Sequence, residues 1–289
     1  MNFSIERLRR LDDFFRSHPL TRDARYSAWL RFLAWQLRSS MGAEVIVPWI
    51  SGQKLAVRRG MTGATGNIYS GLHEFYDMSL VLHFLRQGDL FLDVGANVGS
   101  YTVLASGVCS AETWAFEPDI LSVQRLRRNI QINGLEHRVK VFEAAVGDQR
   151  KDVSFTVGKD TVNRVSTSRL DNDVRVVRQV RLDDVINGAR PSMIKIDVEG
   201  YEENVIAGAD ATLALDSLKL IELETLSPVI EKKLEGFGFS RGFYDAFSRT
   251  MRSHEALTNP SNACFVRDWE FVNKRLAEAP AVSVLGKEI

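Results

Sequence analysis

Residues 90–99, which read LFLDVGANVG, constrain the fold of this chain more than any other stretch. An apolar run ends at Asp93 and is followed by a turn that contains Gly95, Asn97 and Gly99. Sequence compatible with a helix, SYTVLASGV, follows directly. A buried strand, a tight turn and a helix start make the first βα unit of a doubly wound sheet. Such sheets bind ligands beyond the carboxyl ends of their strands.

The spacing of this turn indicates the kind of ligand. Dinucleotide-binding loops follow G-x-G-x-x-G, whereas this turn reads D-x-G-x-N-x-G. A carboxylate from Asp93 at the strand tip favours a ligand with a cationic end and hydroxyls over one that presents a pyrophosphate. S-adenosylmethionine, with its ammonium, sulfonium and ribose, fits this description. The alternative is a glycine turn that closes a strand without binding a ligand.

The residue types of the turn suit close contact with such a ligand. Glycine permits positive φ and a close backbone approach, and asparagine tolerates left-handed geometry better than most residues. We therefore expect the cofactor to contact four residues of the turn: Gly95, Ala96, Asn97 and Gly99.

From residue 89 onward, strand-like and helix-like segments alternate, which predicts an α/β fold with a mostly parallel sheet. The expected strands cover residues 90–94, 113–117, 139–143, 192–197 and 218–223. The expected helices cover residues 99–108, 119–133, 201–214 and 227–236. Two further β-like pieces, VSFTVG and VRVVRQVRL, precede the fourth strand. The segments GFSRGFYDAFSRT and NACFVRD predict an antiparallel hairpin at the C-terminal edge.

The first seventy residues differ from this pattern. Residues 1–43 form an expected helical extension with eight arginines and four acids in its first 40 residues. Residues 44–70 form a small β region, and residues 71–289 the main domain, which begins with a helix over 71–88. We interpret the extension as a cap on the main domain or a homodimer contact. A helix that lies on a membrane surface is the alternative.

Bulk properties limit the partners. The net charge is zero, so nothing predicts a nucleic-acid partner. No apolar run reaches 18 residues, and the N-terminus is too charged for a signal peptide. Cys109 and Cys264 lie far apart in sequence, which favours a reduced, cytoplasmic protein over a disulfide framework. The cysteines and histidines have no metal-ligand spacing, so we assign no metal ligand.

Acidic residues stand at the ends of the second and third predicted strands. Glu117 lies 22 positions after Gly95, where the acid that binds ribose hydroxyls is expected. Pro118 ends this strand, and Asp119 is placed to cap the next helix. Glu143 falls at the third strand tip, where it could accept a hydrogen bond from an adenine amino group. The alternative roles are a helix cap for Glu117 and a solvated loop position for Glu143.

The fourth strand, in SMIKIDVEGYEENVIAGA, carries the second strong signal. Lys195, Asp197 and Glu199 alternate with apolar residues, and charge inside a core strand is costly unless it emerges or is paired. We expect Asp197 and Glu199 to emerge over the cofactor and the acceptor. They could instead cap the next helix or bind Lys195.

Four more candidates flank this region. In the fifth strand, Glu222 and Glu224 share a face by alternation. His73 and Glu74 lie just upstream of the first strand and could close over the cofactor. A surface role is the rival for each.

Several segments together carry a resemblance over roughly residues 70–268. LFLDVGANVGSYT, AFEPD, IKIDVEGYEENVIAGA and NACFVRD resemble the FkbM family of S-adenosylmethionine-dependent methyltransferases, and RLDDVI and GLHEFYDMSLVLHFLRQGD fit it too. The resemblance implies a class I methyltransferase (Rossmann-like) fold and O-methylation, often of sugars or natural products. It fixes neither the acceptor nor the role of the first seventy residues.

The expected chemistry is in-line attack of an acceptor hydroxyl on the sulfonium methyl, with alignment and a general base supplied by the enzyme. We expect Asp197 or Glu199 to be the base, with His73 as the third choice. A divalent ion on Asp197, Glu199 and Glu222 is an alternative, because carboxylate oxygens suit magnesium. Two rival functions remain, a nicotinamide-dependent oxidoreductase and a non-catalytic scaffold in glycan synthesis.

Overall fold

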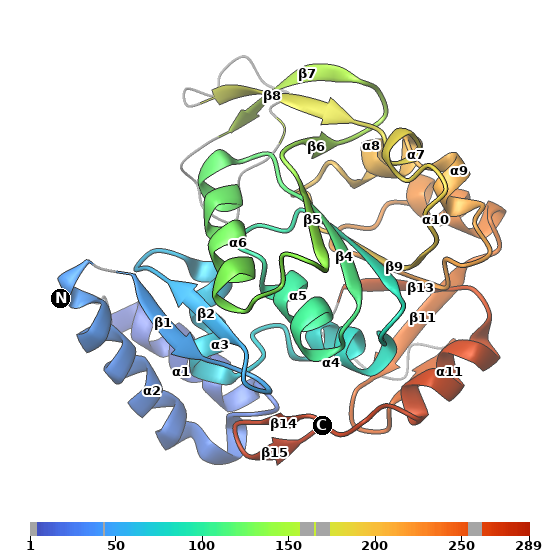
Figure 1. The fold of residues 1–289 in the computed structure, drawn as a ribbon. Helices are drawn as coiled ribbons and strands as arrows, with labels where there is room; N and C mark the ends of the chain where they lie inside the picture. The colour runs from blue at the N-terminus through green and yellow to red at the C-terminus, as the bar shows by residue number, and fades with distance from the viewer. Residues whose placement is uncertain (1–4, 43, 157–164, 166–173, 254–261) are drawn as a thin grey trace.

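The computed structural model describes residues 5–42, 44–156, 165, 174–253 and 262–289 (Figure 1). Its centre is an eight-stranded sheet in the order β12-β11-β13-β10-β9-β3-β4-β5. The five strands β5, β4, β3, β9 and β10 are parallel to one another. Their bounds are β3 Leu90–Val94, β4 Glu112–Phe116, β5 Val139–Phe142, β9 Pro191–Ile196 and β10 Leu220–Leu223.

These five strands confirm the predicted ones, with ends that differ by at most two residues. These strands are predictable because both faces of a parallel sheet are buried, so the strands are almost continuously apolar. All five residues of β3 and all six of β9 are buried. Phe91 and Leu92 belong to core clusters on opposite faces of the sheet.

Helices connect the strands and cover the sheet on both sides (Figure 1). They are α4 Phe75–Phe84, α5 Ser100–Val103 with a π-helical turn Leu104–Val108, α6 Ile120–Ile132, α7 Leu182–Val185, α8 Glu202–Ala207, α9 Asp210–Leu213 and α10 Pro228–Gly236. The sequence predicts one helix over residues 201–214, whereas the structure has two, α8 and α9. Between them, Gly208 packs closely against another loop. A Cβ atom there would lie 2.1 Å from the Gly147 carbonyl oxygen.

The C-terminal side of the sheet is antiparallel, as predicted, but it has one more strand than expected. The segment GFSRGFYDAFSRT contains β11 Ser240–Asp245 and the start of β12 Thr250–Arg252, joined by a tight turn. The following strand, β13 Ala263–Val266, inserts between β10 and β11. Helix α11 Trp269–Ala277 and the hairpin β14 Ser283–Val284 with β15 Lys287–Glu288 had no counterpart in the sequence analysis.

A second, three-stranded sheet interrupts the chain between β5 and β9. It consists of β6 Ala145–Val146, β8 Val174–Val180 and β7 Lys151–Thr156, in that order. Strands β7 and β8 pair antiparallel, in agreement with the β-like sequence found there. The last two residues of VSFTVG lie outside the described residues.

The N-terminal segment packs onto the main domain. It contains α1 Ile5–Ser17, α2 Arg25–Arg38, two 3₁₀ turns Arg22–Ala24 and Ser39–Met41, the hairpin β1 Val45–Pro48 with β2 Lys54–Val57, and α3 Thr62–Ser70. Phe15 and Trp35 share one core cluster with Val103 and Leu126 of the main domain. The C-terminal hairpin reaches back to this segment, where Lys287 Nζ lies 3.1 Å from Asp23 Oδ2.

Two details of this segment were not predicted. The glycine-containing stretch after β2 is helical in α3 rather than part of a β region. Its Gly66 permits close packing, because a Cβ there would lie 2.3 Å from His73 Nδ1.

Among the described residues, we find no helix with the length and apolar character needed to span a bilayer. The three-domain division and the cytoplasmic location stay predictions.

Candidate functional site

A cavity of about 340 Å³ opens at the carboxyl ends of β3, β4, β9 and β10. The chain runs outward from β3 through β4 to β5 and then returns to β9 on the other side of β3. Ligands of doubly wound folds bind at such a switch point, because loops from neighbouring strands diverge there. The cavity is lined by nine of the candidate residues named from the sequence: His73, Glu74, Gly95, Ala96, Asn97, Glu117, Asp197, Glu199 and Glu224.

The glycine turn after β3 is positioned by backbone contacts. The N–H groups of Gly95 and Ala96 both donate to the Phe116 carbonyl oxygen at 3.0 Å. Gly95 has φ +88°, and a Cβ atom there would lie 1.8 Å from the Asp197 carbonyl oxygen. The close approach that requires this glycine is therefore to the end of β9, whereas the sequence analysis had assigned it to a ligand. Asn97 has φ +49°, which confirms the left-handed geometry expected of it.

Glu117 is held at the end of β4 with both carboxylate oxygens in use. Asn97 N–H donates to its Oε2 and Asp119 N–H to its Oε1, each at 2.8 Å. Burial raises the pKa of Glu117 to about 7. Each carboxylate oxygen has a second lone pair that can accept from a ligand hydroxyl. Asp119 caps α6 by accepting from Ser122 N–H at 2.9 Å, so the helix-capping role belongs to Asp119.

Asp93 lies behind the cavity and does not line it. Its side chain is buried, and the Thr102 hydroxyl donates to its Oδ2 at 2.6 Å. Burial raises its pKa to about 6. Gly99 also lies outside the lining, at the start of α5 with φ +88°. Both residues shape the turn in this structure, and contact with the cofactor stays a prediction for them.

The structure does not bring Glu143 into the cavity. Its carboxylate pairs with Arg127 at 2.5 Å on the outer side of the sheet edge. The three residues that follow it, Ala144, Ala145 and Val146, line the cavity instead. Residue type at a strand tip did not reveal this, because the direction of a loop side chain depends on its neighbours.

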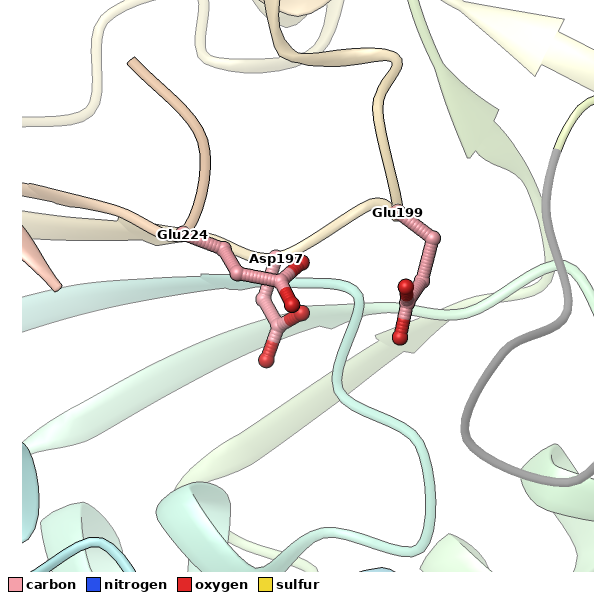
Figure 2. A group of neighbouring side chains, drawn as sticks. All are labelled: Asp197, Glu199 and Glu224. Carbon is pink, nitrogen blue, oxygen red and sulfur yellow. The ribbon is translucent and has the colours of Figure 1, made fainter.

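Three carboxylates meet at the ends of β9 and β10 (Figure 2). Asp197, Glu199 and Glu224 each offer an oxygen, and these oxygens all lie within 4.8 Å of one another. Glu224 joins the group because Leu223 pairs with Ile196 in the parallel ladder, which places the next residues, Glu224 and Asp197, side by side; the Glu224 N–H donates to the Ile196 carbonyl oxygen at 3.1 Å. Glu222 remains in the strand and is buried. The three acids suggested from the sequence as alternative metal ligands therefore change at one position, where Glu224 replaces Glu222.

The acids of this group differ in proton affinity. Burial and the neighbouring Asp197 raise the pKa of Glu224 to about 8, and its carboxyl is hydrogen-bonded to Asp197. Burial would raise the pKa of Asp197 too, but the Lys195 ammonium outweighs burial and lowers it. Lys195 Nζ lies 2.5 Å from Asp197 Oδ2. Three clustered carboxylate oxygens could also hold a divalent cation such as magnesium.

A buried polar layer supports these acids from below. Lys195 Nζ lies 4.4 Å above the Tyr101 ring, and the Tyr101 hydroxyl donates to Glu74 Oε2 at 2.5 Å. Burial and nearby acids raise the pKa of Asp77 well above its usual value. Tyr101 and Asp77 were not predicted from the sequence as parts of this site. An acid in the middle of an apolar helix was the available signal for Asp77.

Asn262 completes this layer from the strand edge. Its side-chain amide donates to Glu222 Oε1 at 3.0 Å, and its backbone N–H donates to Asp77 Oδ1 at 2.9 Å. Burial raises the pKa of Glu222 to about 7. One residue thus bridges two buried acids that lie far apart in the sequence.

His73 and Glu74 close the cavity on the α3 side. The His73 backbone N–H donates to Asn67 Oδ1 at 2.8 Å, which fixes the loop between α3 and α4. Burial lowers the pKa of His73, so its imidazole is neutral at pH 7. Its Nδ1 is buried and has no hydrogen-bond partner within the described part of the chain.

Known proteins that are similar to this chain are methyltransferases. Residues 93–246, more than half of the chain, match the sequence model of the methyltransferase FkbM domain. The hexuronic acid methyltransferase AglP of Haloferax volcanii is 26% identical over 151 residues, which cover 50% of this chain and 59% of that protein. The chain thus spans about three fifths of the length of this relative.

Solved structures of methyltransferases superimpose in part. The crystal structure of methyltransferase FkbM from Methylobacillus flagellatus covers 70% of this chain and 52% of that one, with 16% identity and a TM-score of 0.44. The precorrin-6y C5,15-methyltransferase of Geobacter metallireducens covers 73% and 93%, with 14% identity and a TM-score of 0.41.

Proposed function

Because this chain belongs to the FkbM methyltransferase family, we propose that it transfers a methyl group from S-adenosylmethionine to a hydroxyl of a sugar or glycan. The observation that carries this proposal is the position of Glu117 in the cavity at the switch point. Its two oxygens are oriented by backbone N–H groups and can accept from both hydroxyls of a ribose. An ordered acid that faces a diol is selective for a ribose without a 2′-phosphate.

The residues of the cavity suit both ends of the cofactor. Glu117 and the apolar lining from Ala144 to Val146 would hold the adenosine end. The carboxylates of Glu74 and Asp197, in the same cavity, would hold the cationic end. S-adenosylmethionine, when bound, supplies an electrophilic methyl group. A pyrophosphate would place negative charge against these acids, which disfavours a nicotinamide dinucleotide.

The acidic group at the ends of β9 and β10 supplies a general base for the acceptor hydroxyl. We assign the proton transfer to the Glu224 and Asp197 pair. A base with a pKa near the working pH combines a useful ionised fraction with enough basicity to take a proton. The pKa of Glu224, at about 8, meets this condition better than that of Asp197, which Lys195 lowers. Glu199 stands beside them to orient the acceptor.

The sugar class of the acceptor rests on two supports. Carboxylates commonly accept hydrogen bonds from hydroxyls, and Glu199, Glu224 and Glu74 offer several acceptors in one cavity. In addition, the relative from Haloferax volcanii is named as a methyltransferase for hexuronic acid. We propose a sugar hydroxyl as the methyl acceptor on these grounds.

Calorimetric titration with S-adenosylhomocysteine and with NAD tests the cofactor. We expect binding of S-adenosylhomocysteine, and binding of NAD alone would contradict the proposal. Transfer of labelled methyl groups to a panel of neutral, amino and uronic sugars, free and lipid-linked, tests the acceptor. If the chain binds S-adenosylhomocysteine but methylates nothing in the panel, the scaffold function is favoured instead.

A further inference from the structure

A second cavity, of about 220 Å³, lies at the N-terminal side of the molecule. Its walls come from α2, the β1–β2 hairpin, α3 and the β14–β15 hairpin, which lie together in Figure 1. It shares no lining residue with the strand-tip cavity. The proposed methyl transfer leaves this second cavity unused.

One wall of the second cavity carries a guanidinium with an unused donor. Arg31 Nε donates to the Tyr69 carbonyl oxygen at 2.8 Å. Its Nη2 is buried and has no hydrogen-bond partner among the residues that the structure describes. Burial lowers the pKa of Arg31, but an arginine stays charged in proteins. A buried charged donor without an acceptor is costly, and an anionic ligand would remove that cost.

The other charged residues that line the second cavity also favour an anionic ligand. Arg38, about two helical turns further along α2, lines the same cavity. No carboxylate from the described part of the chain lines it. Two arginines without an acid make a pocket that attracts a carboxylate or a phosphate. In contrast, the strand-tip cavity is lined by several acids.

Two indoles supply an apolar surface next to these arginines. Trp35 and Trp49 both line the second cavity. The Trp49 indole N–H donates to the Gly71 carbonyl oxygen at 2.6 Å, so its ring is held in place. Aromatic walls with a few convergent polar groups are typical of small-ligand sites. The apolar C–H face of a pyranose ring suits such a wall.

We propose that the second cavity binds a pyranose sugar that carries a carboxylate or a phosphate. Arg31 and Arg38 contact the anion, and Trp49, which is only partly buried, contacts the ring. The site does not depend on the assignment of the methyl acceptor, because it uses none of the residues of the strand-tip cavity. Asn67 stands between the two sites, since it lines the second cavity and its side chain also binds the His73 backbone.

Calorimetric titration of the full chain, with S-adenosylhomocysteine present at saturation, tests this site. The ligands are D-glucuronate, D-glucose 1-phosphate and, as the neutral control, D-glucose. We expect both anionic sugars to bind and glucose to bind at least about tenfold more weakly, as a charged hydrogen bond is worth roughly this factor. A preference between the two anionic sugars distinguishes a uronic acid ligand from a sugar phosphate.

Variants of arginines on α2 test whether the anionic sugars bind in the second cavity. Arg31→Gln should weaken the binding of the anionic sugars about tenfold or more, and Arg38→Gln should weaken it severalfold. Arg25→Gln, on the same helix but outside the cavity and paired with Asp12, should leave it unchanged. Arg38 is exposed, so its variant serves if Arg31→Gln does not fold.

Three results would overturn the proposal: no binding of either anionic sugar, equal binding of glucose, or anion binding that both cavity variants retain in full. Failure of S-adenosylhomocysteine to bind would count against the proposed methyl transfer only. The variant series would still report on the second cavity in that case.

Discussion

The two halves of the strand-tip cavity hold their carboxylates in different ways. In the cofactor half, Glu117 accepts hydrogen bonds from two backbone N–H groups, and Asp93, buried behind the cavity, accepts one from the Thr102 hydroxyl. In the acceptor half, the acids lie against one another, and Lys195 is the buried cation beside them. The first arrangement fixes a binding geometry in advance. The second couples the protonation of its acids, which suits proton transfer.

The largest expected effect is on turnover in the acceptor half. Glu224→Gln preserves the size of the side chain but removes its ability to take a proton. We expect turnover at saturating cofactor to fall by about 10²–10⁴-fold, the usual contribution of a general base. The affinity for S-adenosylhomocysteine should change little. Steady-state kinetics and calorimetry measure the two quantities.

The pH profile of the same variant sharpens this prediction. The pKa of Glu224 is raised to about 8, so below pH 8 most molecules carry its proton and lack the active base. Wild-type kcat should rise about tenfold per pH unit up to about pH 8 and then level off. Glu224→Gln should lack this rise, and Glu235→Gln, at an exposed site on α10, should retain it. A lost rise in His73→Gln instead would assign the base to His73.

The next effect is on folding. Lys195 is 2% exposed and faces several buried acids. Lys195→Met leaves these acids without their cation, and breaking a buried pair in this way costs about 3–5 kcal/mol. Urea denaturation at pH 7 measures the loss of unfolding free energy. Lys219→Met, which removes a more exposed pair with Asp268, should cost no more than about 1 kcal/mol. Equal losses would contradict this account of Lys195.

A third substitution, at Gly95, disturbs the backbone contact between the turn after β3 in the cofactor half and the end of β9 in the acceptor half. Gly95→Ala adds a Cβ that would lie 1.8 Å from the Asp197 carbonyl oxygen. We expect a loss of about 3 kcal/mol, which combines positive φ with overpacking. Gly134→Ala is the matched control, because Gly134 also has positive φ but no atom within 4 Å of the added Cβ. Its cost should be only about 1–2 kcal/mol. Thermal denaturation of the two variants separates steric overlap from backbone strain.

The smallest expected effect is on cofactor affinity. At pH 8, above the pKa of about 7 of Glu117, Glu117→Gln replaces an oriented anion by a neutral amide. A hydrogen bond to a charged group is worth about 1.5–3 kcal/mol. The Kd of S-adenosylhomocysteine should therefore rise about 10–100-fold. Glu112→Gln makes the same change at the opposite, exposed end of β4 and should leave the Kd unchanged. If both variants bind like the wild type, Glu117 does not hold the ribose.

The cofactor half was largely predictable because its information is local. The turn spacing placed Gly95 and Asn97, and the distance along the chain placed Glu117 at the next strand tip. Strand and turn geometry repeat with fixed periods, so residue type and position indicate direction. Glu143 is the exception, since its side chain turned toward Arg127 on a neighbouring helix. Nothing in the local sequence sets that pairing.

The acceptor half was less predictable because its contacts connect distant segments. Glu224 lies beside Asp197 because β10 and β9 pair in parallel with Leu223 opposite Ile196, and Glu222 is buried against Asn262. Asp77 on α4 and Tyr101 on α5 reach the same layer from other parts of the chain. Such groups form only when the sheet order brings the segments together.

The amino-acid sequence by itself determined the parallel strands, the glycine turn, the ribose-binding candidate and the family. Each of these follows from periodic burial or from short motifs, which act over a few residues. The tertiary structure alone decided which acids share a proton, why Gly95 admits no side chain, and that two arginines face a second cavity. Those features depend on distances between segments far apart in the chain, and burial at these meeting points sets the proton affinities.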